Sequence, residues 1–271
     1  SPADLLDRMR QIEQNVDPNA VPPEAVPAET TPVAEDAEKI IYGDHDILDY
    51  YEVTDPLQAS WGDAVCAFIP DGNLVYDEPS DTWQIVNPRD YVQWAPVYPS
   101  TGYIGGQGLP IEACEREPFG EQVSVPVCSG FLVEPQLIAT AAHCVQDLAD
   151  LNNYWIVFGY VQEGADPGQY RKSFPSTHVY FGTSIKRRRY YPEQGIDHAL
   201  IELDRPIEMP CVWPLPIRRS GDIAVGETVG TIGHPQGLPR KYSFSPTTQV
   251  KDAGTRNWFR ANIDSYQGNS G

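Results

Sequence analysis

The sequence predicts an all-β fold for the residues after position 39. Short runs rich in Val, Ile, Tyr and Phe alternate with turns that carry Gly, Pro, Asn and Asp, a pattern typical of antiparallel strands. The 26 prolines and 22 glycines in 271 residues argue against long helices in this region. The expected strands include residues 64–69, 129–133, 155–158, 198–203 and 228–232.

Two other stretches of the β-rich region have their own character. The segment 70–126 is rich in Pro, Tyr and Trp and is long for a connection, so we expect an insertion with some strands of its own. A few turns of helix are expected over residues 142–151.

Residues 1–39 differ in composition from the rest of the chain. Apolar residues recur at helical spacing over residues 3–16 and predict a short amphipathic helix. Residues 17–39 are rich in Pro, Ala and Glu and cannot bury enough apolar surface to offset the entropy of ordering, so we expect a linker. Residues 1–39 are therefore either a disordered tail or a pro-segment that ends near Lys39–Ile40.

The charge of the chain excludes some classes of partner. Thirty-eight acidic and 19 basic residues give a net charge of −19, which argues against nucleic-acid binding. The single basic run, Lys186–Arg189, predicts an exposed loop, with a local site for an anionic ligand as the alternative. No apolar stretch is long enough for a membrane span, and none is expected.

The five cysteines form no CxxC pair, so we expect neither a zinc site nor any other metal. They fit a disulfide-forming protein that is secreted, extracellular or periplasmic. Cys66 lies in an apolar run and is expected to be a buried free thiol. Cys114 and Cys211 could pair with each other, with Cys66, or with a cysteine beyond Gly271.

His143 follows two apolar strands and a turn at residues 134–136. The second strand ends in small residues, in the stretch TAAHC, which leave space around the imidazole. Cys128 and Cys144 lie on neighbouring segments of this hairpin, and a disulfide between them would hold the strand pair behind His143. A histidine after small residues is by itself more often structural, but the flanking cysteines favour a catalytic base.

Ser270 lies between glycines in the stretch GNSG. A nucleophilic serine needs nearby backbone N–H groups to stabilise an oxyanion, and glycine permits the necessary turn. The N–H groups of Gly268 and Ser270 would form this oxyanion hole. Such a stretch is also common in ordinary turns.

Asp197 begins the largely apolar stretch DHALIEL. A carboxylate at the head of such a strand can orient an imidazole and stabilise the imidazolium. Capping a strand or turn is the alternative role for an isolated aspartate.

The three motifs together, in the order His, Asp, Ser, resemble those of the trypsin-like serine peptidases. GNSG in place of GDSG resembles the bacterial glutamyl-endopeptidase-like branch, as do the stretches 40–43 (IIYG) and 232–235 (IGHP). The resemblance covers residues 40–271 and implies His143, Asp197 and Ser270 as the catalytic triad.

The resemblance also implies the architecture and the reaction. It predicts two antiparallel six-stranded β-barrels, the first over about 40–190 and the second over about 191–271. It predicts a serine endopeptidase that hydrolyses protein or peptide substrates through an acyl-enzyme, with no cofactor. A catalytically inactive binding protein on the same fold and an esterase with the same triad are the rival functions.

The chain departs from the family pattern at two places. Asn269 replaces the aspartate that pairs with a freed N-terminal ammonium in the trypsin branch, so a cut near Lys39–Ile40 would not act through that ion pair. The family also continues beyond the nucleophile, so the second barrel is incomplete in a chain that stops at Gly271. We expect a further C-terminal segment, as a separate chain or as following sequence, to complete it.

The remaining histidines are expected to have structural roles. His198 adjoins Asp197 but alternation places it on the opposite strand face, and His234 lies in a Gly-His-Pro turn that it would stabilise. His45 and His178 carry no signal.

Overall fold

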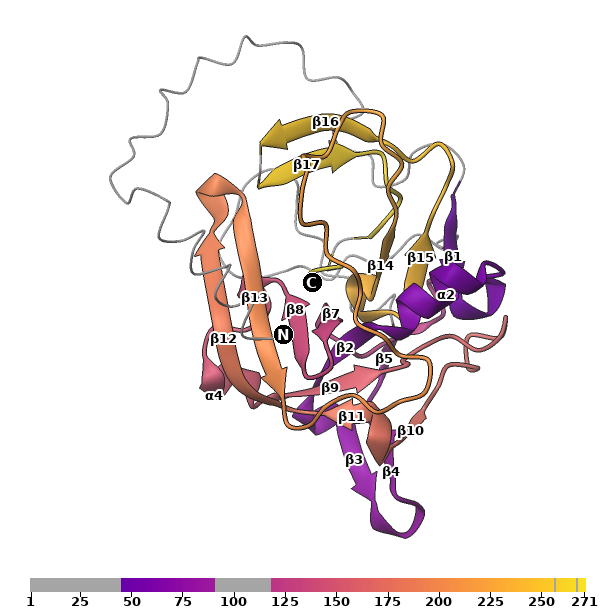
Figure 1. Cartoon of the computed structure of the whole chain (residues 1–271). Helices are drawn as coiled ribbons and strands as arrows, with labels where there is room; N and C mark the ends of the chain where they lie inside the picture. The colour runs from indigo at the N-terminus through magenta and orange to yellow at the C-terminus, as the bar shows by residue number, and fades with distance from the viewer. Residues whose placement is uncertain (1–44, 91–117, 256, 267) are drawn as a thin grey trace, which may run out of the picture. The chain divides into compact units, whose positions relative to one another are not determined.

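The structure is a computed structural model that describes residues 45–90, 118–255, 257–266 and 268–271 (Figure 1). The helix expected over 3–16, the linker 17–39, the cut near Lys39–Ile40, the IIYG stretch and Cys114 lie outside these residues.

Strands dominate the described residues, which confirms the all-β prediction (Figure 1). The strands are β1 (Ile47–Asp49), β2 (Val65–Pro70), β3 (Leu74–Asp77), β4 (Thr82–Ile85), β5 (Arg89–Asp90), β6 (Val123–Ser124), β7 (Cys128–Glu134), β8 (Leu137–Thr140), β9 (Tyr154–Phe158), β10 (Ser173–Pro175), β11 (Val179–Tyr180), β12 (Gly182–Tyr191), β13 (Ile196–Leu203), β14 (Thr231–Gly233), β15 (Lys241–Ser243), β16 (Val250–Thr255) and β17 (Trp258–Ala261). The α-helices are α2 (Pro56–Asp63) and α4 (Leu148–Leu151). The 3-10 helices are η2 (Tyr50–Glu52), η3 (Asp71–Asn73), η4 (Glu78–Ser80), η5 (Ala142–Cys144), η6 (Ser176–His178), η7 (Pro192–Gln194) and η8 (Pro235–Gly237).

Seven strands form one antiparallel sheet in the order β11-β9-β2-β7-β8-β13-β12. Its two edge strands, β11 and β12, are separated in sequence by Phe181 alone, so one bent strand joins both ends of the sheet. The sheet therefore closes on itself as a six-stranded barrel, counting β11 and β12 together. Closure leaves no free edge, and β2 at its centre is buried from Val65 to Ile69.

The strand pairs place the barrel boundaries differently from the sequence. Strand β13 pairs with both β8 and β12 and belongs to the closed barrel, so the expected division near residue 191 is wrong. The apolar face of β13 explains this, because Ala199 and Ile201 are fully buried in the barrel core. Strand β1 pairs instead with β15, in the sheet β1-β15-β14.

The basic run Lys186–Arg189 lies in strand β12 and not in an exposed loop, so that prediction is wrong. The run pairs with β13 and its residues alternate between more and less exposed positions. A β-strand accepts consecutive cations because successive side chains point to opposite faces.

The segment 70–126 has strands of its own in its described part, as expected. Strands β3 and β4 form a hairpin that β10 extends, and β5 pairs with β6. Strands β16 and β17 form a separate hairpin in the last part of the chain. No helix in the part of the chain that the structure describes is long and apolar enough to cross a membrane.

A buried ion pair joins β1 to β15. Lys241 donates to Asp49 and, at 2.5 Å, to the side-chain oxygen of Gln122. The side-chain nitrogen of Gln122 donates to Asp49 at 2.7 Å. Asp49, Gln122 and Lys241 are all buried. Burial lowers the pKa of the Lys241 ammonium to about 8, against the opposing effect of the Asp49 carboxylate.

We predict that Asp49→Asn lowers the free energy of unfolding by about 3 kcal/mol, because it leaves a buried ammonium without its counterion. Denaturant unfolding followed by circular dichroism measures the change. Glu202→Gln, which breaks the partly exposed Lys186–Glu202 pair, is the matched control and should cost less than about 1 kcal/mol. Equal losses in the two variants would contradict a structural role for the buried pair.

Candidate active site

His143 lies in η5, directly after the end of β8, and is held by Asp197. The ring Nδ1 lies 2.5 Å from one carboxylate oxygen of Asp197, and the backbone N–H of His143 donates to the other at 3.0 Å. Because an ionised carboxylate only accepts, the ring proton lies on Nδ1 and leaves Nε2 as an acceptor. The His143 side chain is 43% exposed, so Nε2 is accessible as a base.

Asp197 reaches His143 because of the register of two adjacent strands, β13 and β8. Ala199 in β13 pairs with Thr140 at the end of β8, and η5 begins two residues after Thr140. Asp197 lies two residues before Ala199, on the same strand face, and so extends past the end of β8 to the η5 turn. The sequence order of the motifs could not show this, because it depends on which residues pair.

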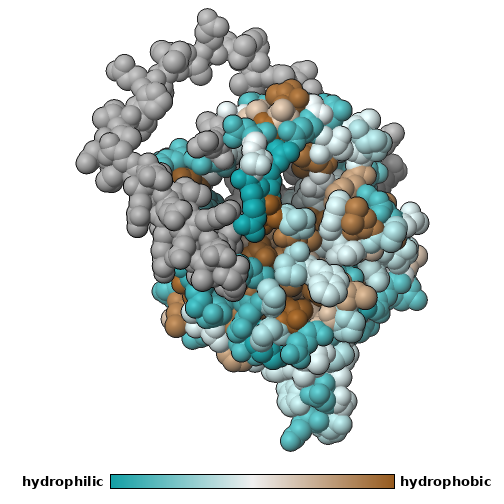
Figure 2. Space-filling model, viewed as in Figure 1, coloured by the Kyte–Doolittle hydropathy of each residue, from teal (hydrophilic) through white to brown (hydrophobic). Residues whose placement is uncertain are grey.

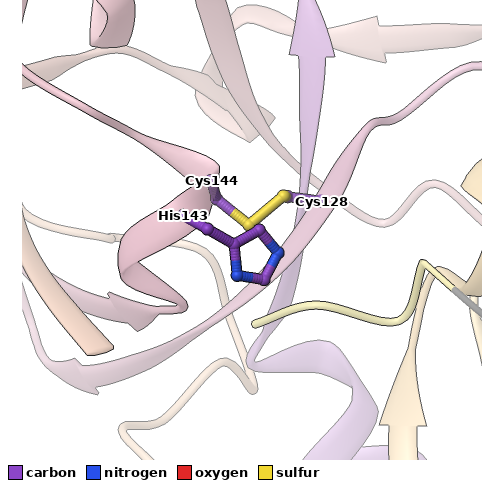
Figure 3. A group of neighbouring side chains, drawn as sticks. All are labelled: Cys128, His143 and Cys144. Carbon is purple, nitrogen blue, oxygen red and sulfur yellow. A yellow bond between two sulfur atoms is a disulfide. The ribbon is translucent and has the colours of Figure 1, made fainter. Parts of the chain in front are cut away.

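The disulfide between Cys128 and Cys144 forms as predicted (Figure 3). It joins the first residue of β7 to the residue after His143, with a Cα–Cα distance of 6.1 Å. The sulfurs and a ring nitrogen of His143 lie within 4.8 Å of one another. Because both sulfurs are in the disulfide, neither is available as a thiolate ligand for a metal.

Ser270 lies against the same disulfide through its backbone. The Ser270 carbonyl accepts a hydrogen bond of 2.6 Å from the N–H of Ser129 and lies 3.8 Å from the Cys144 sulfur. Figure 3 shows the C-terminal ribbon ending near the imidazole of His143. Among the described residues, no hydrogen bond joins the Ser270 hydroxyl to His143.

Gly268, one of the two predicted oxyanion-hole donors, has a left-handed backbone conformation. Gly268 has a φ of +74°, which favours glycine, and packs against Gln236. Within the described part of the chain, the N–H groups of Gly268 and Ser270 donate no hydrogen bond. Their joint role in holding an oxyanion stays a prediction.

Ser129 connects several parts of the site and was not identified from the sequence. Its hydroxyl accepts from the N–H of His234 at 2.8 Å and lies 3.4 Å from the side-chain oxygen of Asn269. Its carbonyl accepts from the Thr140 hydroxyl at 2.7 Å. The one available signal was its position after Cys128, in the strand that the disulfide holds.

Asn269 is held by neutral groups. Its side-chain nitrogen lies 3.3 Å from the Thr231 hydroxyl and 3.5 Å from the Ser265 hydroxyl. A Cβ at Gly233 would overlap the Asn269 side chain, so this close approach requires glycine.

The other candidate residues have structural environments. His234 is 1% exposed and its Nδ1 lies 3.1 Å from the carbonyl of Leu238, which supports the loop-stabilising role. Cys66 is a buried free thiol, as expected, and burial raises its pKa. Cys211 is an exposed free thiol, so it does not pair with Cys66. His198 is half-buried, and burial together with Arg187 lowers its pKa.

Burial lowers the pKa of His234 to about 3, below the usual value of 6.5. Between about pH 3 and 6.5 the unfolded chain therefore binds a proton at this histidine that the folded chain does not. The contribution of His234 to stability is present above pH 6.5 and is lost as the pH falls toward 3.

We predict that acidification from pH 7 to pH 5 destabilises the wild-type protein by about 2 kcal/mol more than it destabilises His234→Gln. Urea unfolding at the two pH values measures the difference. His45→Gln, at an exposed histidine, is the control and should follow the wild type. Parallel pH dependence of His234→Gln and the wild type would contradict a buried neutral His234.

Comparison with known proteins identifies a family. The model of the trypsin-like peptidase domain matches residues 128–271, more than half of the chain. No curated protein matches the sequence.

Several solved structures are similar to the chain. A Glu endopeptidase in complex with MPD is 15% identical over 86% of this chain and 80% of that chain, with a TM-score of 0.47. Human heparin binding protein is 20% identical over 54% of this chain and 68% of that chain, with a TM-score of 0.35. An atomic-resolution structure of HBP is 18% identical over 54% and 67% of the two chains, with a TM-score of 0.33. Because these three TM-scores are below 0.5, the roles of the residues depend on the motifs and contacts given above.

Proposed function

The chain belongs to the trypsin-like peptidase domain family, and from this premise we propose that it is a serine endopeptidase with His143, Asp197 and Ser270 as its triad. The observation that carries the proposal is the double contact between Asp197 and His143, through the ring and through the backbone. A structural histidine does not need a fixed ring with a free, accessible Nε2, whereas a general base does.

The position of Ser270 supports its role as the nucleophile. Its backbone lies against Ser129 and Cys144, and Cys144 is the residue after His143. Catalytic hydrogen bonds are often long or absent without substrate and form in the substrate complex.

The proposed reaction is acyl transfer in two steps. Nε2 of His143 takes the hydroxyl proton of Ser270 as the oxygen attacks the peptide carbonyl, and the N–H groups of Gly268 and Ser270 stabilise the oxyanion. His143 then gives its proton to the leaving amine, which departs and leaves an ester on Ser270. Water, deprotonated by His143, hydrolyses this ester and restores the hydroxyl.

We assign the protein to the bacterial glutamyl-endopeptidase-like branch on its motifs. GNSG and IGHP support the assignment. We also propose that the protein is exported, because the Cys128–Cys144 disulfide needs an oxidising compartment to persist.

We predict that Ser270→Ala and His143→Ala each lower kcat by about 10⁴-fold or more on a peptide substrate, because neither step of the reaction can proceed without its nucleophile or its base. Initial rates on a peptide library measure the loss, and circular dichroism checks the fold. Ser80→Ala, at an exposed serine in η4, is the matched control and should retain wild-type rates.

Labelling with a fluorophosphonate probe separates the rival functions. A peptidase is labelled at Ser270 and cleaves peptides, whereas an esterase is labelled but cleaves simple esters only. An inactive binding protein is not labelled. Labelling of the protein that persists in Ser270→Ala would contradict Ser270 as the nucleophile.

A further inference from the structure

The basic run Lys186–Arg189 has no place in the proposed reaction, yet one of its members touches the active-site turn. We propose that Arg188 is a positioning residue that holds η5, and with it His143, in contact with Asp197. Its effect on catalysis rests on the proposed function, whereas its effect on the geometry of His143 does not.

The contacts of Arg188 lie on both sides of His143. Its Nε–H donates to the carbonyl of Ala142 at 3.1 Å and to the carbonyl of Val145 at 2.7 Å. Ala142 immediately precedes His143, and Val145 follows the disulfide-bonded Cys144. One guanidinium therefore joins the start of the η5 turn to its end.

These carbonyls belong to fully buried residues. Ala142 and Val145 both have a relative exposure of 0%. Arg188 itself is exposed, so its two hydrogen bonds to these carbonyls are only partly buried. A carbonyl that loses its donor is costly while it stays unpaired. The turn would shift as water enters to hydrate these groups, and His143 would move with it.

A bulge in β12 selects Arg188 from the four basic residues. Ile185 pairs with Ile201 and Arg187 with Leu200, so Lys186 is the extra residue of the bulge. Beyond the bulge Arg188 pairs with Ala199, which places it on the strand face that carries Asp197. Without the bulge this face would carry the neighbouring residues instead.

Asp197 and its cross-strand partner Tyr190 lie further along the same strand face. Tyr190 pairs with Asp197 across the two strands, and the Arg188 guanidinium lies 5.6 Å from the centre of the Tyr190 ring. Figure 1 shows β12 and β13 running side by side next to β8. The carboxylate that orients the imidazole and the cation that holds the turn thus come from one hairpin.

This placement ties both ends of the His143–Asp197 contact to the same two strands. Asp197 fixes the ring and the N–H of His143, and Arg188 fixes the carbonyls around it. A shift of η5 would therefore disturb the alignment of the His143 Nε2 with Ser270, even though Asp197 stays in place. Small misplacements of catalytic groups lower the rate of the chemical step by up to about 100-fold.

The experiment compares Arg188→Met with Lys186→Met in the whole protein. Each variant loses one positive charge from β12, but only Arg188→Met loses the bonds to η5. Two quantities are measured: kcat and KM on a peptide substrate, and the ¹⁵N shifts of the His143 ring, assigned with His143→Gln, which report which nitrogen carries the proton.

We expect Arg188→Met to lower kcat by about 10- to 100-fold with KM changed less than about twofold, and to move the His143 ring from the Nδ1–H form toward a mixture of tautomers. Lys186→Met should match the wild type in both. If the protein turns over no peptide, the ring shifts alone test the proposal and only the proposed function fails.

Wild-type kcat and wild-type ring shifts in a folded Arg188→Met would overturn the proposal. If Arg188→Met does not fold, Arg188→Lys decides, because lysine retains an N–H donor. A folded Arg188→Lys should keep kcat within about fivefold of wild type and keep the Nδ1–H form. A folded lysine variant in which the ring loses that form would show that donation to η5 is not what holds His143.

Discussion

The disulfide between Cys128 and Cys144 is the constraint on which the candidate site depends. It fixes the start of β7 to the end of the η5 turn, so the backbone of Ser129 and the ring of His143 keep one relative position. Ser129 in turn receives the Ser270 carbonyl. The proposed nucleophile and the proposed base come from distant parts of the sequence, and both contact the strand that the disulfide holds. A covalent link suits this task because, unlike a hydrogen bond, it is not weakened by the water that reaches an exposed site.

Three cations in the described part of this acidic protein have a common function. Arg240 is 1% exposed and donates to the carbonyl of Gly62 at the end of α2, while Lys241 joins β15 to β1 through Asp49. Arg188, which is exposed, joins β12 to η5 in the same way. Each cation connects an element to a neighbour that is remote in sequence, and guanidinium suits carbonyl acceptors because its donors are fixed in a plane.

Local patterns were sufficient to predict much of the fold and part of the site. The hairpin before His143, the disulfide and the burial of Cys66 follow from apolar runs, a short turn and cysteine positions. The pairing of β13 with β8 does not, because it depends on barrel closure, and so the boundary near 191 was misplaced. The bulge at Lys186 could not be predicted from the sequence either, because a run of four cations has no alternation of apolar and polar residues to fix its strand register.

The loop that carries Ser270 differs from one that depends on a free N-terminus. In the trypsin branch of the family that this chain resembles, an aspartate precedes the nucleophile and requires an ammonium as its counterion. Asn269 is neutral, and hydroxyl groups of Thr231, Ser265 and Ser129 surround it. A neutral amide in a polar pocket carries no charge that needs a partner, so the loop can hold its shape without one. Removal of a pro-segment would therefore not act on this site by forming an ion pair behind Ser270.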